Sequence, residues 1–394
     1  MTVPQRGFTD DEFAQRLAKA QAAMARSDVG ALLLTTEAEI RYFTGFMTQF
    51  WQSPTRPWFV ILPATGKPVA VIPSIGATLM RDCYIDELRC WSSPAEFDDG
   101  ITMLGQTLRT SLHAGGKLGL LMGRETSLGM PLNSFNELNA SLRGVQLYDM
   151  TPEIQHIRMI KSPAEVDKLR HICSITSQVF ASIPDWVQAS MPLDELFRQF
   201  KIRALAAGVD DVSYLVGAAG PGGYNDIIAP PNTRPLAAGD VMMLDTGCIW
   251  DGYFCDFDRN FAVGHASDAA CEAHQRLFDA TEAALKILRP GIAASDVFQA
   301  MHSILAPSGV ATSGDDIGRY GHGIGIQLTE PPSHTSWDKT PIEVGMALTL
   351  EPSVAYGDGL IMVAEENLIV GDNRILLLST RASRDLPIIR LGRN

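Results

Sequence analysis

The stretch VMMLDTGCIWDGYFCDFDRNFAVG, residues 241–264, decides the fold of the second half of this chain. Its two apolar runs flank a glycine-containing turn, which predicts a hairpin of two strands. Asp245 lies in the first run and Asp256 in the second, 11 residues later. Because side chains alternate between the faces of a strand, one carboxylate from each strand can point to the same face. Burying both is costly unless a cation compensates them; the alternative for either one alone is a cap on the turns at Gly247 and Gly252.

Three further segments carry ionisable residues in unusual places. His322 lies in GRYGHGIGIQLTEPP (318–332), between glycines that let the backbone approach a ligand, although a lone histidine is more often structural. Glu351 ends the apolar run of MALTLEPSV. Glu365 and Glu366 lie in GLIMVAEENLIVG, inside an apolar run that predicts a strand. Charged residues seldom occupy such positions without a partner.

Taken together, these residues predict a metal centre. Four carboxylates and one imidazole suit two cations such as Mn²⁺, Fe²⁺, Co²⁺ or Zn²⁺. Two such ions, about 3.5–4 Å apart, can share a bridging hydroxide and polarise the carbonyl that it attacks. An all-oxygen Ca²⁺ or Mg²⁺ site would not need the histidine. The predicted metal ligands are Asp245, Asp256, His322, Glu351 and Glu365.

The 394 residues predict two domains, because one hydrophobic core seldom serves so long a chain. Residues 10–27 have apolar side chains at helical spacing, with Asp10 or Asp11 as the expected cap. Further helices alternate with strands, which predicts an α/β domain over residues 1–155. The predicted strands cover residues 30–36, two parts of 58–74, and 117–123.

The pattern changes near residues 157–172, where Ser162 is expected to cap a helix that begins at Pro163 and has Glu165 in its first turn. Helical segments then accompany antiparallel strands, which predicts an α+β domain over residues 156–394. The predicted helices of this domain cover residues 163–190, 192–208, 267–289 and 294–307.

Composition excludes several classes of protein. The formal net charge is −13 and the chain lacks a Lys/Arg cluster, so we expect no nucleic-acid partner. The N-terminus lacks the pattern of a signal peptide, and no apolar run is long enough for a membrane span, so we expect a cytoplasmic protein with no membrane partner. The six cysteines are scattered without a CxxC pair, which favours buried free thiols.

The motifs LDTGCIWDGYFCDFDRNF, GHGIGIQLTEPP, ALTLEPSV and VAEENLIV resemble the pita-bread metallohydrolase family of methionine aminopeptidase, aminopeptidase P, prolidase and creatinase. Successive predicted ligands are 11, 66, 29 and 14 residues apart, which resembles the prolidase (Xaa-Pro dipeptidase) branch most. The segments IRMIKSPAEVDKLR and RYFTGF (41–46) resemble the same branch, so the resemblance spans nearly the whole chain.

This resemblance implies a pita-bread catalytic domain behind a smaller creatinase-type N-terminal domain, and a homodimer. It implies that Asp245 chelates one ion and that Asp256 and Glu365 bridge both. His322 and Glu351 would complete the shell of the other ion, and Glu351 would also handle the proton of the bridging water, so His322 and Glu351 are the expected catalytic residues. Glu365 rather than Glu366 matches the ligand, and neighbouring residues of a strand point to opposite faces.

On the substrate side the chain departs from the family's peptidases. Where they have two histidines this chain has Ile228 and Thr329, and Asp258 replaces a threonine of their DxTRT motif. His334 is a candidate replacement group, although a histidine in a surface loop is the favoured alternative. Loss of a group that stabilises an oxyanion typically costs about 10²–10³ in rate, so we expect a remodelled substrate pocket.

The segment FTGFMTQFWQSPTRPWF (43–59) is a second candidate for substrate contact. In creatinase-like dimers the matching loop reaches over the pocket of the other subunit. Trp51 and Arg56 could recognise a small cationic or zwitterionic substrate by cation–π contact and carboxylate pairing. A hydrophobic edge at the dimer interface is an equal alternative.

Three functions follow from these observations. The favoured one is a two-metal hydrolase of peptide or small amide C–N bonds that resembles Xaa-Pro dipeptidase and acts on a dipeptide or another small molecule. The second uses the same metal site on a small zwitterion, as a dimethylsulfoniopropionate lyase or creatinase would, although Gly247 stands where such lyases have an aspartate. The third is a non-catalytic binding protein, which retention of all five ligands disfavours.

Overall fold

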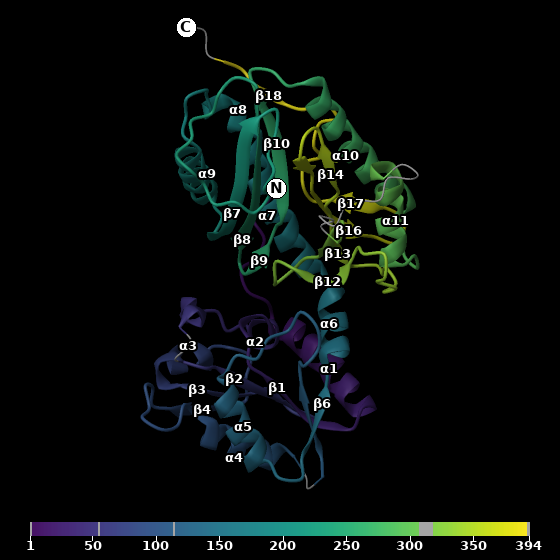
Figure 1. Ribbon diagram of the computed structural model, residues 1–394. Helices are drawn as coiled ribbons and strands as arrows, with labels where there is room; N and C mark the ends of the chain where they lie inside the picture. Colours follow the sequence, from purple (N-terminus) through teal and green to yellow (C-terminus); the bar gives the residue numbers. More distant parts are fainter. Residues whose placement is uncertain (1, 54–55, 113–114, 307–317, 392–394) are drawn as a thin grey trace. The chain divides into compact units, whose positions relative to one another are not determined.

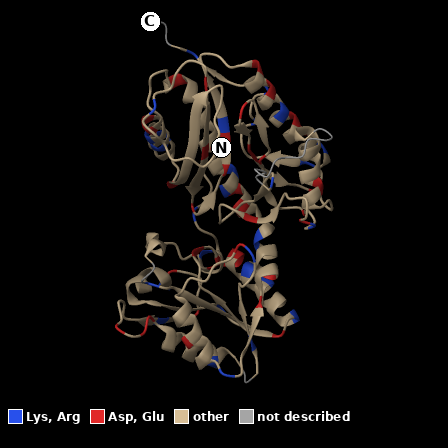
Figure 2. Cartoon of the chain, viewed as in Figure 1, with Lys and Arg blue, Asp and Glu red and all other residues tan. Residues whose placement is uncertain are grey.

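The computed structural model describes residues 2–53, 56–112, 115–306 and 318–391. The chain divides into two compact units: Gln5–Arg158 forms the N-terminal unit, and Met159–Asn394 with Met1–Pro4 forms the C-terminal unit. Each unit has its own sheets and its own apolar core (Figure 1). Both basic and acidic residues lie on helices of each unit (Figure 2).

The N-terminal unit is built on a six-stranded mixed sheet with the order β4-β3-β2-β1-β5-β6. Its central strand has the sequence VGALLL, pairs antiparallel with β2 and parallel with β5, and is buried along almost its whole length. The predicted α/β alternation is therefore present. The strands are β1 (Val29–Leu34), β2 (Phe59–Pro63), β3 (Val69–Pro73), β4 (Glu87–Trp91), β5 (Lys117–Leu120) and β6 (Gln146–Asp149).

The first helix of this unit begins at Asp10, and its capping residue is Thr9, one position before the predicted caps. The hydroxyl of Thr9 accepts a hydrogen bond from the backbone N–H of Glu12, so the prediction of Asp10 or Asp11 as the cap is wrong. Both aspartates lie in the first turn, where their charge interacts favourably with the helix dipole. The helices are α1 (Asp10–Arg26), α2 (Glu37–Thr44), η1 (Gln49–Gln52), η2 (Ser74–Gly76), α3 (Ala77–Arg81), α4 (Ile101–Ser111), α5 (Leu132–Ser141) and α6 (Thr151–Met159).

The C-terminal unit opens with the predicted capping box. The Ser162 hydroxyl accepts the N–H of Glu165 at 3.3 Å, and the Glu165 carboxylate accepts the N–H of Ser162 at 2.9 Å. The predicted helix over 163–190 is wrong in length, because Pro184 lacks an N–H and cannot continue it. The helices are α7 (Pro163–Ala181), α8 (Ile183–Trp186), α9 (Leu193–Ala207), α10 (Asp268–Ile287) and α11 (Ala294–Leu305).

The strands of the C-terminal unit form two larger sheets and a hairpin. One sheet has the order β18-β10-β8-β7 with β9 paired to β8, the other the order β12-β11-β13-β16-β17, and β14 pairs with β15. The predicted hairpin is β8 with β10. The strands are β7 (Asp211–Pro221), β8 (Asp240–Trp250), β9 (Tyr253–Phe254), β10 (Phe257–Val263), β11 (His322–Gly323), β12 (Glu330–Ser333), β13 (Ala347–Leu350), β14 (Ser353–Tyr356), β15 (Leu360–Val363), β16 (Glu366–Val370), β17 (Ile375–Leu377) and β18 (Ile388–Ile389).

One core joins α10 and α11 to both larger sheets. Val241 and Met243 of β8, Ala262 of β10, and Leu348 of β13 are fully buried in it. The helices therefore cover antiparallel sheets, as expected of an α+β unit. None of the described helices is long and apolar enough to cross a lipid bilayer.

Candidate metal centre

Asp245 lies in the middle of β8, between β7 and β10. It pairs with Val216 of β7 and with Asp258 of β10, so the Asp258 side chain shares its face of the sheet. The hydroxyl of Tyr214, on β7, lies 2.9 Å from Asp245 Oδ1 and also contacts Asp256 Oδ1. Tyr214 therefore links the two aspartates of the hairpin.

The tyrosine ring requires a glycine opposite it. Tyr214 pairs with Gly247 across the strands, and a Cβ added at Gly247 would lie 2.5 Å from the ring. Any larger residue would displace the ring, whose hydroxyl contacts the two aspartates. Gly247 is thus a packing requirement of the site.

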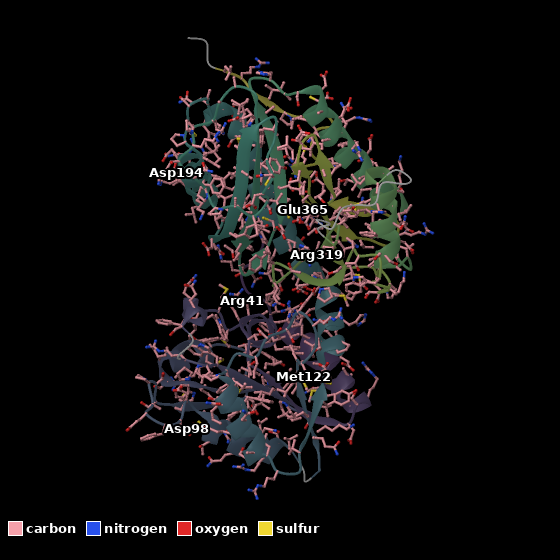
Figure 3. All side chains as sticks on the ribbon, in the orientation of Figure 1. Arg41, Asp98, Met122, Asp194, Arg319 and Glu365 are labelled. Carbon is pink, nitrogen blue, oxygen red and sulfur yellow. The ribbon has the colours of Figure 1, made fainter. Side chains whose placement is uncertain are left out.

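Asp256, His322 and Glu365 form the centre of the site. Each is buried, and each offers a ligand atom within 4.8 Å of the others. The His322 Nε2 atom lies 3.4 Å from Asp256 Oδ2 and 3.8 Å from Glu351 Oε2. Figure 3 labels Glu365 in the C-terminal unit. These residues are 109 positions apart at most (365 − 256) and meet only through the fold.

Asp256, Glu351 and Glu365 all lie at strand ends. Asp256 precedes β10, Glu351 follows β13 and Glu365 precedes β16. The predictions that Asp256 and Glu365 lie inside strands are therefore wrong by one residue each. At these positions the chain leaves the regular ladder, so that a side chain can point into the space between two sheets.

The orientation of His322 is fixed by its backbone neighbours. Its Nδ1 atom lies 2.8 Å from the carbonyl oxygen of Gly323, which can only accept, so Nδ1 carries the proton. Nε2 then faces the carboxylates, and in the neutral imidazole it would offer its lone pair to a cation bound among them. Gly321 has a φ of +128°, and a Cβ there would lie 2.4 Å from the carbonyl oxygen of Thr349, so only glycine fits.

Burial and mutual repulsion disfavour the charged forms of these acids. Burial, followed by the charge of neighbouring carboxylates, raises the pKa of Asp245 and Glu365 well above the ordinary values. Burial also raises the pKa of Glu351, against the opposing effect of His322. For His322, burial alone would lower the pKa, but the hydrogen bond and charge of Asp256 raise it. His322 and Arg319 oppose the rise for Glu351, yet the pKa of all three acids stays raised, so the described residues leave the carboxylates short of positive charge.

Unpaired oxygen atoms indicate what would supply that charge. Glu351 Oε2 and Glu365 Oε1 are buried and have no hydrogen-bond partner among the described residues. Buried oxygens of this kind are normally paired. The ligand atoms present, carboxylate oxygens with one imidazole nitrogen, therefore fit divalent cations of the first transition series.

Three of the residues expected to bind substrate, His334, Thr329 and Ile228, belong to the same C-terminal unit as this centre. His334 has no exposed surface, so the alternative of a surface-loop histidine is wrong: its backbone bonds with Gly321 and Tyr320 draw it inside. Burial lowers its pKa to about 4. Thr329 is half-buried beside Glu330, which forms a buried ion pair with Lys161 at 2.9 Å. Ile228 is 76% exposed in the loop between β7 and β8.

Asp258 is the substrate-side residue that lies against the predicted ligands. It is buried, and its Oδ1 atom has no hydrogen-bond partner among the described residues. Burial raises its pKa well above the ordinary value, while the adjacent Arg259 opposes this rise. The guanidinium of Arg259 donates to the backbone oxygen of Asp258 rather than to its carboxylate.

Trp51 and Arg56 belong to the N-terminal unit. The Trp51 ring packs against Phe46 and Trp58, and the Arg56 guanidinium lies over the ring of Phe50. This arrangement combines an aromatic cluster with a cation, as the sequence predicted. Its role in substrate binding stays a prediction.

Tyr214 is a site residue that the sequence did not reveal, and so are Arg259 and Asn367. A tyrosine in an apolar strand reads as core until the strand register places it beside two aspartates. Asn367 and Arg259 contact the backbone of Asp256 and Glu365, and no spacing rule predicts such contacts.

A buried centre of carboxylates and one imidazole, between antiparallel sheets, makes this protein a candidate metalloenzyme. Residues 167–372 match the family model for metallopeptidase family M24, and residues 16–160 match the creatinase/prolidase N-terminal domain. This chain belongs to metallopeptidase family M24. The predicted pita-bread fold, the creatinase-type N-terminal domain and the prediction of a metallopeptidase-class enzyme are therefore confirmed.

Similar proteins extend over the whole chain. A probable dipeptidase PepE from Mycobacterium tuberculosis is 25% identical over 93% of this chain and 96% of that protein. The crystal structure of dipeptidase PepE from Mycobacterium ulcerans is 26% identical, with a TM-score of 0.83 over 98% of this chain and 100% of that one. A prolidase from Thermococcus sibiricus, 24% identical, has the same fold with a TM-score of 0.83 over 97% and 100%.

Proposed function

We propose that this protein is a dinuclear-metal-dependent hydrolase of peptide or small amide C–N bonds, with Xaa-Pro dipeptides as the first substrates to test. The observation that carries the proposal is the buried cluster of Asp256, His322 and Glu365, with unpaired carboxylate oxygens, in a chain of family M24. Relatives named as dipeptidase and prolidase support this substrate class.

Five residues would hold the two ions. Asp245 would bind one ion, Asp256 and Glu365 would bridge both, and His322 and Glu351 would complete the other shell. Mn²⁺, Fe²⁺, Co²⁺ and Zn²⁺ all suit this set. Two such ions lower the pKa of a bound water and polarise a carbonyl, which is the chemistry that amide hydrolysis needs.

The remaining steps belong to protein side chains. Glu351 Oε2 has no hydrogen-bond partner among the described residues, and burial raises the pKa of this carboxyl, so Glu351 can accept a proton from the attacking water and return it to the leaving nitrogen. Tyr214 holds Asp245 and Asp256 in register through its hydroxyl. The Nδ1–H of His322 is committed to Gly323, which keeps Nε2 directed at the carboxylates.

Asp258 would recognise positive charge on the substrate. The four other carboxylates would balance two divalent ions, whereas an ionised Asp258 would add a negative charge that those ions leave unbalanced, and its buried Oδ1 atom has no hydrogen-bond partner among the described residues. A free ammonium group, as in the N-terminus of a dipeptide, would neutralise it. Ile228, Thr329, His334, Trp51 and Arg56 are the other proposed contributors to a pocket that differs from that of the family's peptidases.

Asp258 also favours a second candidate function. A small zwitterion carries positive charge as well, so the same centre could act on one in a lyase-like or creatinase-like reaction. The hydrolase remains the main proposal, because the relatives are named as peptidases. A non-catalytic binding protein would have little use for five retained ligands, three of which, Asp256, His322 and Glu365, are buried.

The test is reconstitution of metal-free protein. Chelated protein reloaded with Mn²⁺ is expected to bind two ions per chain and to cleave members of a panel of Xaa-Pro dipeptides. Binding of two ions without cleavage of any dipeptide would contradict the peptidase, and release of product from a zwitterion panel would then support the second candidate. Binding of less than one ion per chain would contradict both.

A further inference from the structure

The two residues proposed to bridge the ions share an unusual structural setting. Asp256 lies between β9 and β10, and Glu365 lies between β15 and β16, so each occupies a short break between strands. In such a break the sheet ladder does not fix the backbone. Other groups must therefore fix the positions of the two carboxylates.

Asn367 of β16 holds the backbone of Asp256. The Asp256 N–H donates to Asn367 Oδ1 at 3.0 Å, and Asn367 Nδ2 donates to the carbonyl oxygen of Asp256. The Asn367 side chain has no exposed surface, and Cys173 Sγ donates to the same Oδ1 at 3.4 Å. The side-chain amide of Asn367 thus satisfies both the N–H and the carbonyl oxygen of Asp256.

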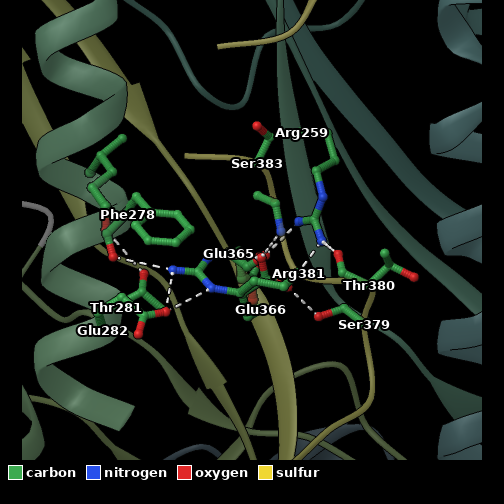
Figure 4. Close-up of polar contacts among 12 residues, drawn as sticks. Arg259, Phe278, Thr281, Glu282, Glu365, Glu366, Ser379, Thr380, Arg381 and Ser383 are labelled. Carbon is green, nitrogen blue, oxygen red and sulfur yellow. Dashed lines mark hydrogen bonds and ion pairs between the residues drawn. The ribbon is translucent and has the colours of Figure 1, made fainter. Parts of the chain in front are cut away.

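Arg259 of β10 holds the backbone of Glu365 through the carbonyl oxygen. Its Nη1 atom donates to the carbonyl oxygen of Glu365 at 2.7 Å and to that of Asp258 at 2.6 Å. Its Nη2 atom donates to Glu366 Oε2 at 3.0 Å. Figure 4 shows Arg259 beside Glu365 and Glu366, with the Arg381 side chain on the other side of Glu366.

Glu366 anchors this arginine. Its carboxylate also accepts hydrogen bonds from Arg381 Nη1 at 3.1 Å, from the N–H of Ala382 at 2.8 Å and from the hydroxyl of Ser379. Only 1% of Glu366 is exposed, so this charge is almost completely satisfied inside the protein. The adjacent glutamates therefore have separate tasks: Glu366 faces arginines, and Glu365 faces Asp256 and His322.

We propose that Asn367 and Arg259 are positioning residues that together set the separation between Asp256 and Glu365. Each residue extends from the strand that follows one bridging ligand to the backbone of the other, so the pair forms a reciprocal clamp. This inference rests on the proposed dinuclear centre. It assigns the clamp a specific role, which is to make the site fit a second ion after the first has bound.

The test measures stepwise metal binding by Asn367→Leu and Arg259→Lys. Leucine keeps the branched shape of asparagine, although it is larger, and lacks the amide; lysine keeps the charge but not the planar fork of donors that contacts several acceptors at once. Calorimetric titration of the metal-free proteins with Mn²⁺ is expected to give a first site close to that of the unaltered protein and a second site weakened about 10–100-fold. Electron paramagnetic resonance of loaded protein should report altered coupling between the two Mn²⁺ ions.

Glu282→Gln is the matched control, because it removes a partner of Arg381 and leaves the contacts of Arg259 and Asn367 with the ligand backbones in place. Circular dichroism establishes that each variant is folded; if Asn367→Leu is not, Arg259→Lys carries the test. Two ions bound with unaltered affinity and coupling in the folded variants would overturn the clamp. Failure of the unaltered protein to bind two ions would instead overturn the dinuclear centre on which the clamp rests.

Discussion

At the scale of single residues, burial decides what each ionisable group can do. His334 and Asp258 are both fully or almost fully buried, and each has a polar atom without a hydrogen-bond partner among the described residues. Burial favours the neutral form of both groups, which lowers the pKa of the histidine and raises that of the acid. His334 is therefore tested through the pH dependence of stability, and Asp258 through substrate affinity.

His334 should make the protein sensitive to acid. Its pKa falls from an ordinary 6.5 to about 4, so the unfolded chain binds a proton more readily than the folded one. Its contribution to stability is present above about pH 6.5 and is lost as the pH falls toward 4. From pH 7.5 to pH 5 we expect the unfolding free energy of metal-free His334→Gln to rise by about 2 kcal/mol relative to that of the unaltered protein, measured by urea denaturation.

The control for this prediction is His265→Gln, which removes an exposed histidine. It should have the same pH dependence as the unaltered protein. If the unfolding free energy changes by the same amount between pH 7.5 and pH 5 in all three proteins, His334 is protonated in the folded state at pH 5.

Asp258 should govern substrate affinity. If it binds the ammonium group of a dipeptide, Asp258→Asn should raise KM by about 10–100-fold, the range for loss of a buried charged hydrogen bond, with a smaller change in kcat. Steady-state kinetics of the Mn²⁺-loaded variant measures both. Asp385→Asn, at an exposed position, is the control. An unaltered KM in folded, metal-loaded Asp258→Asn would exclude the proposed contact.

At the scale of elements, strand register brings the site together. The pairing of β7 with β8 places Tyr214 over Gly247, and the pairing of β8 with β10 places Asp258 opposite Asp245. A shift by one residue would turn each of these side chains to the other face. The register of β7, β8 and β10 therefore matters to the site more than the β-strand propensity of the residues in any one of these strands.

Gly247→Ala tests this packing. The added Cβ would lie 2.5 Å from the Tyr214 ring, so we expect about 1–3 kcal/mol of destabilisation and weaker metal binding as the hydroxyl moves away from Asp245. Thermal unfolding and Mn²⁺ titration measure the two effects. A double-mutant cycle with Tyr214→Ala should recover part of the stability, because the clash needs both groups. Additive effects of the two substitutions would show that the ring is not what the new methyl group meets.

At the scale of the whole molecule, the C-terminal unit gathers four carboxylates and an imidazole from β8, β11 and the ends of three other strands. No salt bridge to lysine or arginine neutralises Asp245, Asp256, Glu351 or Glu365 among the described contacts. The fold therefore holds an excess of negative charge that bound cations would relieve.

Metal removal should make stability fall with rising pH. Burial and neighbouring charges raise the pKa of Asp245 and Glu365 in the metal-free fold, so the folded state holds protons that the unfolded state releases. Their contribution is present below the ordinary carboxyl pKa near 4 and is lost as the pH rises through the raised values. Chelated protein should thus have a lower Tm at pH 8 than at pH 6, by several degrees or more.

Protein reloaded with Mn²⁺ is the control, and its Tm should depend much less on pH because the ions stabilise the charged carboxylates. A chelated protein that is equally stable at pH 6 and pH 8 would contradict the metal-free pKa shifts. Scanning calorimetry of both forms at the two pH values makes the comparison.

By itself the sequence determined the alternation of helices and strands in the N-terminal part, the hairpin of β8 and β10, the capping box at Ser162 and the resemblance to the pita-bread family. These depend on periodicity, capping chemistry and spacing, which are local properties of a chain. Only the tertiary structure decided that His334 is buried, that Tyr214 joins two aspartates and that Asn367 and Arg259 contact the backbones of Asp256 and Glu365. The physical reason is that burial, strand register and side-chain contacts depend on which distant segments pack together, and no local pattern records that choice.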